Sequence, residues 1–319
     1  MAIELKNYGW QVDDTSASVG ENILNALENI AEFGSSGTGI GQFNSPAGIT
    51  VIDNRLFVCD YNNHRIQSVN VDGSGNMSNG VEFGINGSGI GQFNSPNGIT
   101  AIGNRLFVCD RSNHRIQSVN VDGSGNMSNG TTFGTNGTGI GQFNLPTGIT
   151  AIGNRLFVCE YSSHRIQSVN VDGSGNMSNG TAFGTNGTGI GQFNQPYRIT
   201  AIGNRLFVCE YNNHRIQSVN VDGSGNMSNG TTFGTNGTGI GQFNLPFGIT
   251  AINNRLFVCE NNNHRIQSVN VDGSGNMSNG TTFGTNGSGI GQFSAPNGIT
   301  AIDNRLFVCD ASNNRIQRI

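Results

Sequence analysis

A repeat of fifty residues, which fills most of the chain, constrains the fold more than any other feature. The GQF triplet of this repeat begins at Gly41, Gly91, Gly141, Gly191, Gly241 and Gly291. Internal periodicity of this length is typical of arrays and propellers, in which each unit buries its apolar surface against its neighbours. We therefore expect the 319 residues to form one architecture rather than several independent domains.

Each repeat contains four short β-prone runs separated by Gly, Asn, Asp and Ser. In one copy these runs are GITAI, RLFVC, RIQSVNV and a segment ending in TTF. Four strands per unit and six units predict an all-β fold, a six-bladed β-propeller of four-stranded antiparallel blades. The last repeat stops at Ile319 after its third strand, whereas Phe33 aligns with Phe83. We expect an N-terminal strand within residues 28–33 to complete the last blade and close the ring.

The first 27 residues do not follow the repeat, and we interpret residues 1–27 as an N-terminal arm of uncertain structure. AIELKNYGWQV is compatible with an extra strand, and ENILNALENI has an apolar spacing that a helix also uses. The propeller is predicted to span residues 28–319. MAIELKNYGW lacks the apolar core of a signal peptide and no run is long enough to cross a bilayer, so we expect a cytoplasmic protein without a membrane partner.

The motifs of the repeat resemble those of the NHL repeat. They are GQF, a proline shortly after it, GIT-x-I, LFVC followed by Asp or Glu, and N-H-R-I-Q. The resemblance covers residues 28–319 and implies a six-bladed propeller. It also implies two functions to weigh, because some NHL propellers are similar to RNA-binding domains and some NHL-like lyases use a metal in the tunnel.

The charge balance of the chain favours neither nucleic acid nor an anionic membrane as a partner. Charged residues make up 11% of the sequence and the net charge is −4. Binding to a phosphate backbone normally leaves a basic face as its footprint. RNA therefore stays a possible but weakly supported partner, since only Arg111 and Arg198 are basic among the positions that vary between repeats.

Three series of residues recur once per repeat, and each has a structural interpretation. The six cysteines lie too far apart on a ring for disulfides, so we expect reduced, buried thiols. The His64 series, which ends in Asn314, is also too widely spaced to share one metal, and we expect local hydrogen bonds from it. The acid after LFVC and the arginine five residues later predict an ion pair. The sequence therefore predicts no catalytic residues, no metal site and no cofactor.

Differences between the copies gather in two windows. Residues 65–80 recur unchanged at 115–130, 165–180, 215–230 and 265–280, whereas the run into the first strand and the loop after the second strand vary. Both windows belong to the same face of an up-and-down blade, around the mouth of the tunnel, and carry residue types that anchor interfaces. The candidate partner-binding residues are Tyr197, Arg198, Phe247, Leu245, Leu145, Asn97, Asn297, Tyr61, Arg111, Tyr161 and Tyr211.

From this bias we predict a non-enzymatic module that recognises a protein or peptide through the variable face. Three alternatives stay open: an RNA-binding NHL-like domain, a metal-dependent lyase or hydrolase built on a propeller, and a recently duplicated or engineered ring without a retained partner. Fold alone decides between none of them.

Overall fold

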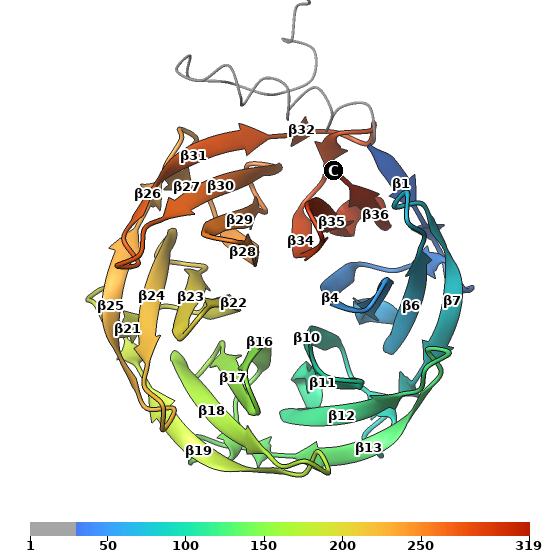
Figure 1. Ribbon diagram of the computed structural model, residues 1–319, viewed down its shortest axis with the longest axis horizontal. Coiled ribbons are helices and arrows are strands. Elements are labelled where there is room, and N and C mark those ends of the chain that lie inside the picture. The colour runs from blue at the N-terminus through green and yellow to red at the C-terminus, as the bar shows by residue number, and fades with distance from the viewer. Residues whose placement is uncertain (1–29) are drawn as a thin grey trace, which may run out of the picture.

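Each fifty-residue repeat forms one antiparallel sheet whose strands run in order from the central tunnel to the rim (Figure 1). The computed structural model describes residues 30–319. Blade one contains β4 (Pro46–Ile52), β5 (Arg55–Asp60), β6 (Arg65–Val71) and β7 (Met77–Phe83). Blade two contains β10 (Pro96–Ile102), β11 (Arg105–Asp110), β12 (Arg115–Val121) and β13 (Met127–Phe133). Blade three contains β16 (Pro146–Ile152), β17 (Arg155–Glu160), β18 (Arg165–Val171) and β19 (Met177–Phe183).

The remaining blades repeat this order. Blade four contains β22 (Pro196–Ile202), β23 (Arg205–Glu210), β24 (Arg215–Val221) and β25 (Met227–Phe233). Blade five contains β28 (Pro246–Ile252), β29 (Arg255–Glu260), β30 (Arg265–Val271) and β31 (Met277–Phe283). Blade six contains β34 (Pro296–Ile302), β35 (Arg305–Asp310), β36 (Arg315–Arg318) and β1 (Ala31–Phe33). The six blades of four antiparallel strands confirm the predicted fold class.

The Gly-rich connections between blades contain a feature that the sequence did not predict, a pair of two-residue parallel strands in each copy. The pairs are β2 (Ser35–Ser36) with β3 (Gln42–Phe43), β8 (Ile85–Asn86) with β9 (Gln92–Phe93), β14 (Thr135–Asn136) with β15 (Gln142–Phe143), β20 (Thr185–Asn186) with β21 (Gln192–Phe193), β26 (Thr235–Asn236) with β27 (Gln242–Phe243), and β32 (Thr285–Asn286) with β33 (Gln292–Phe293). Three of the loops after the second strand form 3-10 turns, η2 (Tyr61–Asn63), η3 (Arg111–Asn113) and η4 (Ala311–Asn313).

The ring closes through the first described strand, as the truncated last repeat predicts. Strand β1 pairs antiparallel with β36, with Ala31 opposite Arg318 and Phe33 opposite Ile316. Glu32 on β1 also forms an ion pair with Arg315 on β36. Blade six therefore takes strands from both ends of the repeat region, and no sheet edge faces a gap in the ring. The predictions made for residues 1–27 lie outside the described residues.

The hydrophobic core lies at the seams between blades rather than inside single sheets. Phe143 of the GQF triplet is fully buried and packs with Phe107 of blade two and Leu156 of blade three. Its ring meets that of Phe133 edge to face, with centroids 6.1 Å apart. The equivalent phenylalanines are buried in the same way. Both faces of the LFVC strand are covered by neighbouring blades, which explains why that strand is apolar at every position.

A buried acid holds each interblade connection in place, and blade two shows the arrangement. The carboxylate of Asp110, which is fully buried, accepts hydrogen bonds from the backbone N–H of Asn94 at 2.7 Å, Asn113 Nδ2 at 2.9 Å, Arg115 Nε at 2.8 Å and Gln117 Nε2 at 3.0 Å. The arginine in turn donates to backbone carbonyls of the preceding connection. The predicted ion pair is present in every blade, with Asp or Glu as the acid.

The histidine series joins each blade to the next, which corrects the expectation of bonds within the local loop. The Nδ1 atom of His214 accepts the backbone N–H of Leu245, thirty-one residues further on, at 3.3 Å. In the sixth copy the Oδ1 atom of Asn314 accepts the N–H of Ser45 at 2.8 Å and so completes the circle. Each of these residues has a positive φ, near 51–56°, a conformation that asparagine adopts readily. Asn314 therefore reproduces both the backbone conformation and the hydrogen-bond acceptor of the histidines.

The histidine hydrogen bonds between blades predict a lower stability of the folded protein at mildly acidic pH. Burial lowers the pKa of His164 and His214 below its ordinary value, and the Nδ1 acceptor requires the neutral ring. A lowered folded-state pKa means that the stability is complete above the unfolded pKa of about 6.5 and is lost as the pH falls through the folded pKa. We expect the melting temperature to fall between pH 7.5 and pH 5.

The control for this prediction copies the sixth blade. Replacing His164 and His214 by asparagine keeps an acceptor that does not titrate, so the double variant should lose less stability over the same pH interval. Burial raises the pKa of Glu210 and Glu260, whose contribution runs in the opposite direction, but these acids are common to both proteins. Equal pH dependence of the two melting temperatures would contradict the assignment.

Candidate functional site

The two variable windows meet at one end of the tunnel, as the sequence comparison predicted. In blade three the backbone N–H of Tyr161, in the second window, donates to the carbonyl of Leu145, in the first, at 3.2 Å. In blade four the rings of Tyr197 and Tyr211, one from each window, have centroids 6.1 Å apart. Leu245 is placed like Leu145, with its carbonyl accepting the N–H of Asn261 at 3.2 Å.

An aromatic cluster forms part of this end of the ring. Tyr197 lies 4.1 Å from Phe247 and 6.0 Å from Tyr161, measured between ring centroids. Tyr211 contacts the same three rings, at 5.3 Å from Phe247 and 6.3 Å from Tyr161. The cluster continues to blade two, where the guanidinium carbon of Arg111 lies 5.6 Å from the centroid of Tyr161. Blades two to five thus each contribute at least one side chain to a continuous surface.

The first blade extends the same cluster. Arg111 Nη1 donates to the hydroxyl of Tyr61 at 3.4 Å. Tyr61, Arg111, Tyr161, Tyr211 and Phe247 are all partly exposed. This arc of side chains forms the mouth, and the buried residues beside it form the tunnel.

Arg198 occupies the tunnel itself, at a position where the five other repeats have glycine. These glycines are required because the inner strands approach closely: a Cβ at Gly98 would lie 2.1 Å from the carbonyl oxygen of Thr147. Blade four keeps the register of the other blades, with Pro196 opposite Glu210 and Ile199 opposite Val208, and adds a pair between Arg198 and Cys209. The other blades pair next at the isoleucine one residue further on.

The guanidinium of Arg198 is buried, with 7% of the residue exposed, and its partners are uncharged. Nη1 donates to Asn97 Oδ1 at 2.6 Å and to the carbonyl oxygen of Thr147 at 2.8 Å, and Nη2 donates to Asn297 Oδ1 at 3.0 Å. Nε is buried without a hydrogen-bond partner. Within residues 30–319, no carboxylate forms an ion pair with this arginine. Among the described residues, the positive charge of Arg198 at the centre of the ring therefore has no carboxylate partner.

The six buried thiols around the tunnel do not balance this charge. All are free. Burial raises the pKa of Cys59 to about 12, although the positive charge of Arg198 acts in the opposite direction. Burial likewise raises the pKa of Cys109 well above its ordinary value, against the opposing effect of Arg198. These thiols are consequently protonated at neutral pH, and they are not the thiolates that nucleophilic chemistry needs.

A small cavity of about 50 Å³ lies in the tunnel beside Arg198. Its walls are glycine backbone and isoleucine side chains from the inner strands, including Gly98, Gly248, Ile99 and Ile249. A cavity of this size has room for a few water molecules or one small ion or group, because one water needs about 10–15 Å³ on this measure.

The structure buries part of the set that the sequence proposed as a partner-binding surface. Tyr197 is 9% exposed, Asn97 is 2% exposed and Asn297 is 8% exposed, and all three line the interior beside Arg198. A macromolecule cannot reach these side chains, whereas a small molecule or its end group can. Sequence reasoning left out Thr147, whose carbonyl contacts Arg198, although Thr147 occupies the same variable position as Tyr197 and Asn97.

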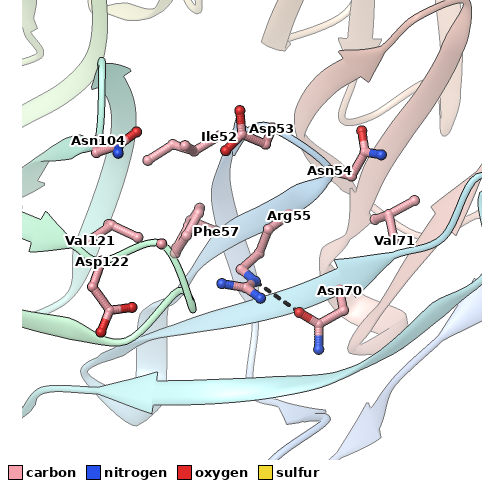
Figure 2. A pocket seen from close by; sticks show the side chains of 11 residues that line it. Ile52, Asp53, Asn54, Arg55, Phe57, Asn70, Val71, Asn104, Val121 and Asp122 are labelled. Atoms are coloured by element: carbon pink, nitrogen blue, oxygen red, sulfur yellow. Dashed lines mark hydrogen bonds between the residues drawn. The ribbon is translucent and has the colours of Figure 1, made fainter.

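Larger grooves recur at the blade seams, and Figure 2 shows one of them, about 320 Å³ in volume. Equivalent grooves of about 340 and 350 Å³ lie at two further seams. In the first, Arg55 donates through Nε to Asn70 Oδ1 at 2.8 Å. In the last, Arg155 makes the same bond and also donates to the carbonyl of Ser224 in the next blade. Arg155 thus joins two adjacent blades, whereas the bond of Arg55 stays within blade one.

Metal ligands are not gathered at the tunnel. Within residues 30–319, no group of three or more His, Cys, Asp or Glu side chains is arranged to hold a metal ion. The residues at the mouth are instead arginine, asparagine, threonine and aromatic side chains, which are poor ligands for a resident transition metal. In the same part of the chain, no helix has the length and apolar character needed to cross a bilayer.

Comparison with known families agrees with the repeat architecture. The profile of the NHL repeat matches residues 43–67 and 93–117, each of which runs from the GQF phenylalanine to the third strand. Two copies of the repeat in this six-bladed β-propeller therefore match the NHL repeat. The profile of the BspA type leucine rich repeat region also matches, at residues 136–263 and 181–314. Leucine-rich repeats of 20–29 residues stack parallel strands into a horseshoe, whereas the blades here are antiparallel, so this second match disagrees with the structure.

Solved structures resemble this NHL propeller over most of its length, at low sequence identity. Periplasmic gluconolactonase of Pseudomonas aeruginosa is 12% identical with a TM-score of 0.61, covering 91% of this chain and 91% of its own. Virginiamycin B lyase of Staphylococcus aureus, solved with quinupristin, is 16% identical with a TM-score of 0.57, covering 91% of this chain and 98% of its own. A protein from Lactobacillus plantarum is 14% identical with a TM-score of 0.59, covering 85% and 79%. No curated protein sequence matches the chain.

These relatives correct the function predicted from the sequence. We expected a non-enzymatic module that binds a protein or peptide, and propellers with this fold include a lactonase and a lyase. The physical reason for the error is burial: the variable residues that looked like interface anchors line the tunnel and its mouth. The prediction that the protein is not an enzyme is contradicted by the same comparison, because the similar propellers include enzymes.

Proposed function

We propose that this NHL propeller is a hydrolase that opens small lactones at the tunnel mouth. The observation that carries the proposal is Arg198, a buried cation without a carboxylate partner among residues 30–319, placed beside a cavity and an aromatic cluster. A buried charge is expensive unless something compensates it. Five sister repeats do without it, which indicates that blade four retains it for function rather than for folding. The similarity to a gluconolactonase supports the same reaction class.

The chemistry follows from where the positive charge lies. Water attacks the lactone carbonyl carbon, the carbonyl oxygen becomes an oxyanion, and the guanidinium of Arg198 stabilises that negative charge. The bond from the carbonyl carbon to the ring oxygen then breaks, the ring oxygen takes a proton that the attacking water loses, and a hydroxy acid results. A donor fixed in place before the reaction stabilises the transition state most effectively in a site that excludes water. Asn97 and Asn297 act as positioning residues, because each holds one nitrogen of the guanidinium.

Turnover of lactones tests this proposal. We expect the protein to release acid from five- and six-membered lactones faster than the spontaneous reaction, measured by titration at constant pH. Replacing Arg198 by glycine, the residue of the other five repeats, should lower kcat by about 100-fold to 1000-fold, the usual effect of removing one oxyanion-stabilising donor. Arg255→Ala serves as the matched control, since it removes an arginine that donates to Asn270 Oδ1 at 3.0 Å and does not belong to the mouth or the tunnel. Lactone turnover that Arg198→Gly leaves unchanged would overturn the assignment, as would no turnover above the spontaneous rate.

A further inference from the structure

We infer that the tunnel contains a binding site for one small carboxylate, held side-on by the Nε and Nη2 edge of Arg198. The inference concerns the same residue as the proposed function, but it needs no turnover and is tested by binding alone. It rests on three observations: the charge of the site, the unused donors of the guanidinium, and the size and polarity of the cavity.

The charge of the site requires an anion. An isolated ion in a low-dielectric interior costs several kcal/mol after relaxation. Arg198 has hydrogen bonds to two amide oxygens and one backbone carbonyl, which satisfy donors but carry no net charge. Because the surrounding thiols are protonated and no carboxylate within residues 30–319 pairs with Arg198, a bound anion would balance the charge of the site.

The unused donors lie on one edge of the guanidinium. The group has five N–H donors in a fixed plane. Nη1 uses both of its N–H groups, on Asn97 and Thr147, and Nη2 uses one of its two, on Asn297. The N–H of Nε is buried and unbonded. Nε and Nη2 together form the edge with which arginine grips a carboxylate through two parallel hydrogen bonds, so the two oxygens of a carboxylate complete the set.

The cavity limits which anion fits. About 50 Å³ is available, between glycine backbone and isoleucine side chains. A planar carboxylate with a small substituent fits this space and matches the donor edge. Phosphate and sulfate are tetrahedral and strongly hydrated, and no residue that lines the cavity other than Arg198 carries a charge that could replace their water. The ligand class is therefore a small monocarboxylate, which is also the class of group that lactone hydrolysis produces.

Binding of formate and acetate to the full-length protein tests the inference. We expect each to raise the melting temperature at constant ionic strength, by about 5 °C when its concentration is a hundred times Kd. Calorimetric titration should give one site per chain. Arg198→Gly should fold, melt at or above the anion-free wild type and show no shift. Arg198→Lys, which keeps the charge but loses the two-pronged edge, should bind at least tenfold more weakly. Arg198→Gln provides a second uncharged variant if the glycine variant does not fold.

The outcomes separate this inference from the proposed function. Formate binding that depends on Arg198 supports the site even if no lactone is hydrolysed. An equal shift in wild type and Arg198→Gly overturns it, as does tighter binding of sulfate or phosphate than of formate. If lactone turnover depends on Arg198 but neither formate nor acetate binds, the proposed hydrolase activity is supported and the carboxylate site is rejected.

Discussion

Replacing Asp110 by alanine is expected to lower the free energy of unfolding by about 3–5 kcal/mol, because the change leaves the partner charge buried and unpaired. Four donors converge on this carboxylate, and the closest ones belong to Arg115 and to the backbone of Asn94. Without the acid, the guanidinium of Arg115 and the amide of Gln117 lose the acceptor that they share. Urea denaturation, monitored by far-ultraviolet circular dichroism, measures the change in the free energy of unfolding.

The chain supplies its own control for this prediction. Glu210 stands at the same position in blade four and keeps all four contacts, including Arg215 at 2.6 Å and Gln217 at 3.0 Å. Asp110→Glu should therefore stay within about 1 kcal/mol of the wild type, the range of a well-tolerated substitution. If glutamate proved as damaging as alanine, the loss would come from packing rather than from the missing carboxylate.

Replacing Phe143 by alanine should cost about 3–5 kcal/mol, since truncating a fully buried phenylalanine removes apolar contacts and leaves a cavity. This ring is fully buried between blades two and three. Its loss weakens two blades together, so we expect one unfolding transition at a lower urea midpoint rather than separate melting of one blade.

Ile140 offers the comparison for the phenylalanine. It lies three residues earlier in the same connection but is 44% exposed. Ile140→Ala should change the free energy of unfolding by less than about 0.5 kcal/mol, as surface substitutions usually do. Similar losses for the two variants would mean that the connection as a whole, and not the buried ring, stabilises the seam.

Most of the fold could be predicted because the same pattern of strands and turns recurs in six copies of the repeat. The period predicted the number of blades. The missing fourth strand of the last repeat predicted a closing strand within residues 28–33, and the structure has it at Ala31–Phe33. The ion pair between Asp110 and Arg115 was visible because only five residues separate the partners and they flank one hairpin. These features depend on local spacing, which a sequence displays directly.

The features that escaped prediction depend on the distance between blades. The bond from Leu245 to His214 joins different repeats, and nothing in either repeat alone shows it. The burial of Arg198 follows from how closely the six inner strands approach one another around the axis. Variation between copies pointed to one end of the ring, where the two variable windows meet. It could not tell an exposed surface from the lining of a tunnel, and that difference changed the proposed function.

Pairing of β1 with β36 also determines how the molecule would respond to mechanical force. The strands are antiparallel, and Ala31 at the beginning of one lies opposite Arg318 at the end of the other. Tension applied to the two termini therefore loads the backbone hydrogen bonds one after another instead of shearing them all at once. We expect the ring to open at low force by separation of β1 from β36 in blade six. The five blades made from continuous chain should stay folded at that force.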